Sequence, residues 1–244
     1  MPLAPVLSAS LLLVATVPQV IPRPSPPTAD AVLLELKAGN ERFVRGRRTR
    51  SLLSAEDPRL RRTLARGQNP SAVIVTSSDS RVETSFIFDQ ELGRLFTIRE
   101  AGNSPDTLGL ASAEYAVAHL GCPLIVVLGH TSCGAVAAVA DAKGAALPGN
   151  FAVFQQAMAG LLESTPQLDG EDPRDFHNRL AEVNAIQQAR RMLQRSGLLA
   201  EQAAAGKLKI LPAIYELSSG RVIFLSDPPP RLKKADPAAD PLEQ

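Results

Sequence analysis

Three short runs of consecutive apolar residues recur along the middle of this 244-residue chain. They are AVIVT at 72–76, LFTI at 95–98 and PLIVVLG at 123–129. Continuous apolar, β-branched runs of this length are typical of strands that are buried on both faces. Between the second and third runs, residues 104–120 have an alanine-rich helical pattern. Strand, helix and strand in this order predict a βαβ unit, and hence a parallel sheet with right-handed crossovers.

Helical patterns flank these strands. Thr28 is a plausible N-cap for a first helix that ends near Gly46 and has apolar residues at helical spacing, namely Val32, Leu33, Leu36 and Phe43. A second short helix carries Leu60 and Leu64. Ser104 is expected to cap the helix of the βαβ unit, with Pro105 at its first position. After Cys133 the chain is expected to be mostly helical through Leu199.

The end of the folded region reads as a hairpin. The run KLKILPAIYEL is followed by a Ser218–Ser219–Gly220 turn and then by RVIFL. Such a turn joins two strands in antiparallel pairing, which we place at the sheet edge. The predicted fold class is therefore α/β, with a mainly parallel central sheet flanked by helices and a C-terminal hairpin at its edge.

Both ends of the sequence differ from the middle. Residues 6–17 are apolar and of signal-peptide length, but no Lys or Arg precedes them and no clean cleavage pattern follows. Proline-rich stretches cover 17–27 and 227–244. We therefore expect a leader or flexible extension over 1–27, a folded domain over 28–226 and a disordered tail over 227–244. An exported protein and a cytoplasmic one fit this pattern equally well. No apolar run reaches the ~20 residues that a membrane-spanning helix needs.

Composition excludes several classes of protein. Hydrophobic residues make up 45% of the chain, charged residues 21%, and the formal net charge is +1. These values exclude a wholly disordered chain, and they show no excess of positive charge that would indicate binding to nucleic acid or to an acidic membrane. The basic run RGRRTR at 45–50 is best explained as a solvated helix end. Two cysteines, Cys122 and Cys133, cannot form a disulfide framework.

Polar residues follow each of the three predicted strands. They are SSDSR at 77–81, EAGN at 100–103 and HTSCGA at 130–135. Ligands of open parallel sheets bind beyond the carboxyl ends of the strands, so we expect these segments to converge. His130 and Cys133 supply nitrogen and sulfur ligands of the kind that zinc prefers, and Asp79 arrives from the neighbouring strand end. The pattern predicts a zinc site, although HxxC on its own is a common chance pair.

Several motifs together resemble the β-class carbonic anhydrases. They are LKAGNERF at 36–43, SDSRV at 78–82, FDQ at 88–90, IREAGN at 98–103 and LGHTSCGA at 128–135. The closing segment from Gly206 is also similar to that family, and the resemblance covers about residues 30–225. It implies reversible hydration of carbon dioxide to bicarbonate by a zinc-bound hydroxide, since zinc lowers the pKa of bound water from 15.7 to about 7. It also implies a homodimer or homotetramer in which the first helix packs on the neighbour, although its apolar face would cover its own sheet equally well.

The resemblance assigns roles to individual residues. His130 and Cys133 match two zinc ligands. Asp79 and Arg81 match a catalytic pair in which the carboxylate orients the nucleophile and the guanidinium holds the carboxylate off the metal. Gln90, Gly102 and Asn103 are expected to border the substrate pocket. The alternative is that Gln90 lies at a capped helix end and that Gly102 and Asn103 form only a turn.

The match fails at Ser77, where the family pattern CxDSR has a cysteine ligand. A neutral hydroxyl is a poor zinc donor, so we expect Asp79 to complete the ligand set, with weaker metal binding and impaired catalysis. Two alternatives stay open. One is a catalytically silent relative that binds bicarbonate or serves as an assembly subunit. The other is a zinc hydrolase acting on carbon disulfide or carbonyl sulfide.

The remaining candidates have simpler interpretations. Cys122 leads into an apolar run and is expected to be a buried structural thiol. His119 ends a helix, and His177 lies in a polar helical segment, so neither is expected to bind metal. Redox chemistry is disfavoured because the two cysteines lie eleven positions apart on different elements.

Overall fold

The computed structural model describes residues 27–226. The predicted tail, and all of the predicted leader except its last residue, lie outside this range. The described chain forms a five-stranded sheet in the order β2-β1-β3-β4-β5. The strands are β1 (Ala72–Thr76), β2 (Leu95–Arg99), β3 (Leu124–His130), β4 (Lys209–Tyr215) and β5 (Val222–Phe224). The three predicted strands are therefore present at the expected positions. The expectation of burial on both faces is wrong for β2, which lies at the sheet edge and has only Ile98 buried.

The first four strands are parallel, and the last pair is antiparallel. β1 pairs with β2 and β3, and β3 pairs with β4, all in parallel. β5 returns along β4 as an antiparallel hairpin at the edge. The predicted fold class, a mainly parallel sheet flanked by helices with a C-terminal hairpin, is confirmed.

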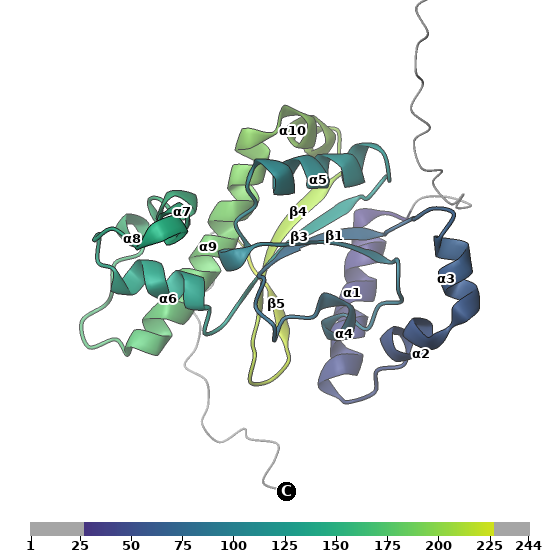
Figure 1. Ribbon diagram of the computed structural model, residues 1–244, viewed down its shortest axis with the longest axis horizontal. Helices are drawn as coiled ribbons and strands as arrows, with labels where there is room; N and C mark the ends of the chain where they lie inside the picture. The colour runs from purple at the N-terminus through teal and green to yellow at the C-terminus, as the bar shows by residue number, and fades with distance from the viewer. Residues whose placement is uncertain (1–26, 227–244) are drawn as a thin grey trace, which may run out of the picture.

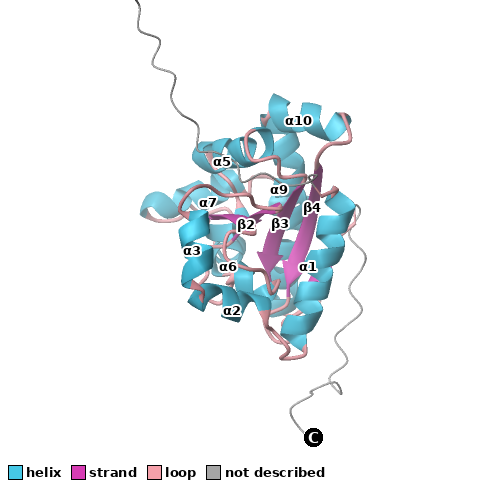
Figure 2. Ribbon diagram, turned by 90° about the vertical axis from the view of Figure 1, so that its right-hand side faces the viewer, coloured by secondary structure: helices cyan, strands magenta, loops and turns pink. Residues whose placement is uncertain are grey.

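Helices cover both faces of the sheet (Figures 1 and 2). They are α1 (Ala29–Val44), α2 (Arg50–Glu56), α3 (Pro58–Leu64), α4 (Thr84–Ile87), α5 (Thr107–Ala118), α6 (Gly134–Asp141), α7 (Ala152–Ala157), α8 (Leu161–Ser164), α9 (Pro173–Arg195) and α10 (Gly197–Ala204). Short 3-10 turns lie at Ala101–Asn103 (η1) and Gly149–Phe151 (η2). No helix within residues 27–226 is both long enough and apolar enough to cross a bilayer.

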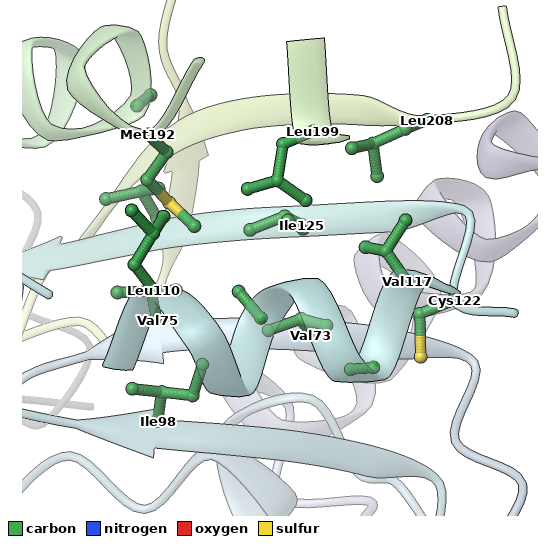
Figure 3. Packing of buried hydrophobic residues seen from close by; sticks show 14 of the residues in the cluster. Val73, Val75, Ile98, Leu110, Val117, Cys122, Ile125, Met192, Leu199 and Leu208 are labelled. Atoms are coloured by element: carbon green, nitrogen blue, oxygen red, sulfur yellow. The ribbon is translucent and has the colours of Figure 1, made fainter. Parts of the chain in front are cut away.

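Alternation along β1 and β3 divides the core between two faces. Val73, Val75 and Ile125 pack with α5, α9 and α10, as Figure 3 shows. Ile74 and Leu124 face the opposite side and pack with α1 and α4. Because β1 and β3 are buried on both faces, their side chains are apolar on both faces through Val75 in β1 and Leu128 in β3. This explains the continuous apolar runs in the sequence.

The first helix covers its own sheet. Thr28 Oγ1 accepts a hydrogen bond from the Ala31 backbone N–H at 3.2 Å, as expected of the N-cap. Val32 and Leu36 are buried in the cluster beneath α1. Of the two interpretations of this apolar face, the structure therefore supports the one in which it covers its own sheet. The long α9 packs against β3 and β4 from the other face.

The start of α5 differs from the prediction. Its N-cap is Asp106, whose Oδ1 accepts a hydrogen bond from the Gly109 N–H at 2.8 Å. The prediction that Ser104 caps this helix is wrong, because the Ser104 hydroxyl instead donates to the Gly102 carbonyl at 3.0 Å. Pro105 accordingly lies before the helix. The predicted short helix with Leu60 and Leu64 is α3, and α2 precedes it without having been predicted.

Candidate metal centre

The carboxyl ends of β1 and β3 bring two polar loops together. The strands are parallel neighbours, with Thr76 paired to Leu128, so the chain leaves both at the same edge of the sheet. Residues 77–81 follow β1, and residues 131–133 lead from β3 into α6. The Arg81 guanidinium bridges the two loops, since its Nη2 donates to the Ser132 carbonyl at 3.2 Å. The predicted convergence of the first and third strand ends is therefore present.

Asp79 and Arg81 form a two-point ion pair. Arg81 Nη2 lies 2.6 Å from Asp79 Oδ2, and its Nε lies 2.9 Å from Oδ1. The Arg81 backbone N–H also donates to Oδ1. Hydrogen bonding from Arg81 lowers the pKa of Asp79 far below its usual value, and this effect outweighs the opposing effect of burial. Asp79 is thus a carboxylate held in a fixed orientation.

His130 presents a buried nitrogen without a hydrogen-bond partner. Its side chain is 0% exposed, and Nδ1 lies 2.9 Å from the Thr131 carbonyl, so Nδ1 carries the proton. Nε2 has no hydrogen-bond partner and lies 3.9 Å from Asp79 Oδ2. A histidine fixed through one nitrogen with the other left free is the arrangement typical of a metal ligand.

Cys133 lies beside His130 at the start of α6. Burial raises the pKa of its thiol, but the His130 imidazole and the backbone N–H groups of Val136 and Ala135 outweigh burial, so the pKa lies below the usual value. Burial has the opposite effect on His130, whose pKa it lowers. Cys133, the Thr131 carbonyl and Asp79 outweigh burial, so the pKa of His130 lies above its usual value. These surroundings therefore stabilise the thiolate, the form in which cysteine binds zinc, relative to a free thiol.

Ser77 is buried at the same edge but presents a different donor. Its Oγ accepts a hydrogen bond from the Asp79 backbone N–H at 3.1 Å. Within residues 27–226, no group of three or more His, Cys, Asp or Glu side chains is arranged to hold a metal ion. The residues present fit zinc with one imidazole and one thiolate. The Asp79 carboxylate can become a third ligand only if it breaks its ion pair with Arg81.

Gly102 and Asn103 lie in η1, at the end of β2, and both are buried. Gly102 has a φ of 68°, a conformation that favours glycine, and a Cβ atom there would also displace Met158, whose Cε would lie 2.1 Å away. Asn103 Nδ2 is buried without a hydrogen-bond partner. Gln90 lies against α1 near Gly39, and its side-chain amide donates to the Phe88 carbonyl at 2.9 Å. Gln90 therefore does not take part in the hydrogen bonds of the two loops.

Backbone strain is concentrated in the same motifs. Four non-glycine residues in the described range have positive φ, and three of them are Asp89 at 42°, Asn103 at 46° and Ser132 at 53°. Each such residue costs about 1 kcal/mol or more and persists only where surrounding contacts impose it. Asp89, for example, is fully buried and accepts hydrogen bonds from Arg42 Nε and the Ser51 N–H.

Two residues beside the loops escaped the sequence analysis. Arg99, at the end of β2, donates from Nε to the Ser77 carbonyl at 3.2 Å and from Nη2 to the Asp79 carbonyl at 2.8 Å. Asn178, on α9, accepts a hydrogen bond from the Ser132 N–H at 2.8 Å. Arg99 lies within the IREAGN motif, so the sequence did mark its neighbourhood as functional. Asn178 lies 46 positions from Ser132, and no motif marks it.

Comparison with known proteins identifies the family. Residues 72–222 match the family described as carbonic anhydrase. Carbonic anhydrase 2 of Mycobacterium tuberculosis is 40% identical over 196 residues, which are 78% of this chain and 89% of that protein. Two tetrameric β-carbonic anhydrases from Sordaria macrospora are represented by a solved structure with a TM-score of 0.64 and 26% identity, covering 71% of this chain and 89% of that one.

The chain belongs to the β-carbonic anhydrase family. A further β-carbonic anhydrase, CafA of Aspergillus fumigatus, superposes with a TM-score of 0.63 at 29% identity, covering 80% of this chain and 89% of that one. The carbonic anhydrase of Mycolicibacterium smegmatis is 36% identical over 194 residues, 77% of this chain and 88% of that protein.

The other cysteine and histidines of this β-carbonic anhydrase lie away from the two loops. Cys122 is buried in the core, and its Sγ donates to the Pro70 carbonyl at 3.5 Å, as expected of a structural thiol. His119 is the C-cap of α5, and its ring lies 5.3 Å from that of Tyr115 at a tilt of 33°. His177 Nε2 lies 3.1 Å from Asp141 Oδ1 near the surface.

Proposed function

We propose that this chain catalyses the reversible hydration of carbon dioxide at a zinc ion held by His130, Cys133 and Asp79, with weaker metal binding than two thiolates would give. The observation that carries the proposal is the free, buried Nε2 of His130, which lies beside Cys133 and 3.9 Å from Asp79 Oδ2. Family membership supports the reaction, since the similar M. tuberculosis and M. smegmatis proteins are named carbonic anhydrases.

Zinc, when bound here, acts as a Lewis acid that makes a water molecule nucleophilic near neutral pH. The protein's own residues do the rest. The Thr131 carbonyl holds the His130 tautomer that leaves Nε2 free. Asp79 can accept a hydrogen bond from the attacking water and orient it only while it is paired with Arg81 and off the metal. Gly102 and Asn103 border the substrate pocket, and the unpartnered Asn103 Nδ2 is available to an oxygen of the substrate.

Ser77 is expected to lower both the zinc affinity and the hydration rate of this site. Ser77 stands where the family pattern has a cysteine, and its hydroxyl is a neutral donor that already accepts from Asp79 N–H. If a four-ligand zinc site contributes about 10–16 kcal/mol, one thiolate accounts for roughly 3 kcal/mol, or about two orders of magnitude in affinity. Asp79 cannot both replace that thiolate and orient the nucleophile, so the hydration rate is lowered as well.

A second candidate is a catalytically silent relative that binds bicarbonate or serves as an assembly subunit. It is favoured by one observation: residues 27–226 contain no group of three His, Cys, Asp or Glu side chains ready to hold a metal ion. The two candidates differ in whether zinc binds at all.

The deciding experiment compares the natural protein with Ser77→Cys and with Ser77→Ala. Zinc content after dialysis, zinc affinity against a competing chelator and carbon dioxide hydration by stopped flow are measured for all three. We expect zinc affinity about 100-fold higher for Ser77→Cys, a faster hydration rate for it, and equal affinities for the natural protein and Ser77→Ala. Full zinc occupancy and an undiminished rate in the natural protein would contradict the role given to Ser77. No zinc uptake at excess metal, with no hydration, would establish the silent candidate.

The proposed assembly is a homodimer or homotetramer, supported by the tetrameric state named for the S. macrospora proteins. Light scattering on the full chain tests it. The proposed folded unit is 28–226, and limited proteolysis that leaves this fragment intact would support those bounds.

A further inference from the structure

Two of the three proposed zinc donors lie on backbone segments at the strand ends: Asp79 in residues 77–79 after β1, and Cys133 in residues 131–133 after β3, while His130 is the last residue of β3 itself. We propose that Arg99 and Asn178 are positioning residues that fix the spacing between these segments, so that the donors are pre-arranged before metal binds. Their hydrogen bonds at the site reach backbone atoms of the two segments and none of the donor atoms. The proposal rests on the proposed function, because it concerns the same metal site.

Arg99 holds the first segment through two hydrogen bonds. Its Nε donates to the Ser77 carbonyl and its Nη2 to the Asp79 carbonyl, so both ends of the segment are tied to one rigid group. The remaining nitrogen, Nη1, lies 3.3 Å from Glu83 Oε2, which orients the guanidinium. Because Arg99 is the last residue of β2, it ties the segment to a strand already paired with β1. A lysine has no planar fork with which to make these contacts together.

Asn178 holds the second segment from α9. Its Oδ1 accepts a hydrogen bond from the Ser132 N–H, while Arg81 Nη2 donates to the Ser132 carbonyl. Ser132 has a φ of 53°, an unfavourable conformation for this residue, which must therefore be imposed by its partners. Ser132 directly precedes Cys133, so its backbone conformation sets the direction in which the Cys133 sulfur points.

The two residues stand on elements that do not depend on the loops for their place. α9 is 23 residues long, begins at an Asp172 cap and packs along β3 and β4. Holding ligands in place from outside lowers the ordering cost of metal binding, and such outer contacts typically change metal affinity by about 10- to 100-fold. A merely structural role would change folding stability without changing how Cys133 meets the metal.

Cobalt distinguishes these two roles, because Co²⁺ bound by a thiolate has a charge-transfer absorption band that reports on sulfur coordination. The variants are Asn178→Leu, which removes the acceptor, Asn178→Asp, which keeps it, and Arg99→Lys, which removes the fork. The controls are Arg174→Ala, exposed on the same helix, and Arg94→Lys, just before β2. All are made in the natural chain and again together with Ser77→Cys.

We expect Asn178→Leu and Arg99→Lys to lower Co²⁺ and Zn²⁺ affinity about tenfold or more and to weaken or shift the band at saturating Co²⁺. Asn178→Asp should restore the band, and the controls should match the parent. Melting temperature, measured without metal, identifies any variant that fails to fold, and the milder Asn178→Ser then replaces Asn178→Leu.

Affinities and spectra equal to those of the controls would overturn the proposal, whatever happens to the melting temperature. If the natural chain binds no metal while Ser77→Cys does, the proposed function fails for the natural chain, and the positioning roles are decided in the Ser77→Cys background. If neither background binds metal, both proposals are overturned.

Discussion

Oδ2 of Asp79 lies 3.9 Å from Nε2 of His130. The two atoms come from different strand ends, and the imidazole nitrogen has no other partner. What keeps the carboxylate at this distance is its two-point contact with Arg81 at 2.6 and 2.9 Å. The Arg81 ion pair therefore decides whether Asp79 is free to become a metal ligand.

Replacing Arg81 by Gln should raise zinc affinity about tenfold and lower the hydration rate. In the natural protein the Arg81 guanidinium repels a divalent cation by about 1–3 kcal/mol near the surface. Removing this repulsion favours zinc binding by more than the roughly 1 kcal/mol that the lost hydrogen bond to Ser132 costs. Asp79 then moves to the metal and no longer orients the nucleophile. Chelator competition and stopped-flow hydration measure the two effects, with the exposed Arg47→Gln as control. A fall in zinc affinity would show that Arg81 supports the site rather than restrains Asp79.

The fold was predictable where side-chain burial leaves a local pattern. β1 and β3 are buried on both faces, so their sequences are apolar except at their carboxyl ends, and this pattern predicts strands. His130 and Asp79 could be placed together because both follow such strands in a parallel sheet. The start of α5 was mispredicted because Ser104 and Asp106 are both good N-caps, and the pattern does not show that the Ser104 hydroxyl turns back to the Gly102 carbonyl.

The parts of the site that sequence could not reveal depend on contacts between distant positions. Asn178 meets Ser132 only because α9 lies along β3. Gln90 follows a recognisable motif, yet the motif alone does not say that its amide faces Phe88 and Gly39. Likewise, the basic run at 45–50 needed partners elsewhere in the chain: Arg50 pairs with Glu35, and Arg48 lies over the Phe86 ring.

Asn40→Ala should lower the free energy of unfolding by roughly 3 kcal/mol. The Asn40 amide is buried and donates to the carbonyls of Ile87 and Gly220, while its Oδ1 accepts from the Val222 N–H. Alanine leaves these three backbone groups without partners at the junction of α1, α4 and the hairpin. Urea titration measures the loss. The exposed Asn150→Ala is the control, and an equal, small effect in both variants would contradict this account.

Gly39→Ala should destabilise the fold far more than Gly197→Ala. A Cβ atom at Gly39 would lie 1.8 Å from the Phe88 carbonyl oxygen, so α1 and the end of α4 would have to separate. At Gly197, the first residue of α10, no atom lies within 4 Å of the added Cβ, and alanine there should be neutral or stabilising by up to about 1 kcal/mol. Thermal unfolding of both variants tests the contrast, which would be lost if the two melting temperatures agreed.

Glu182 should make folding stability fall as pH rises from about 4.5 to about 7. Burial on α9 raises the pKa of its carboxyl from 4.5 to about 7, with Arg179 opposing the shift. Below 4.5 the group is neutral in both the folded and the unfolded states. Between the two values the unfolded state ionises first, and above 7 the folded state must hold a buried charge. The difference corresponds to roughly 3 kcal/mol as an upper value.

Glu182→Gln isolates this contribution from those of the other carboxylates, some of which act in the opposite direction. Asp89 and Glu171, for example, have lowered pKa values and lose stabilising contacts on acidification. The stability of Glu182→Gln relative to the natural protein should therefore increase between pH 5 and pH 8, as measured by urea titration at each pH. Glu201→Gln, at an exposed position on α10, should keep a constant difference. A constant difference for Glu182→Gln as well would mean that Glu182 is charged in the folded protein throughout this range, with Arg179 compensating fully for its burial.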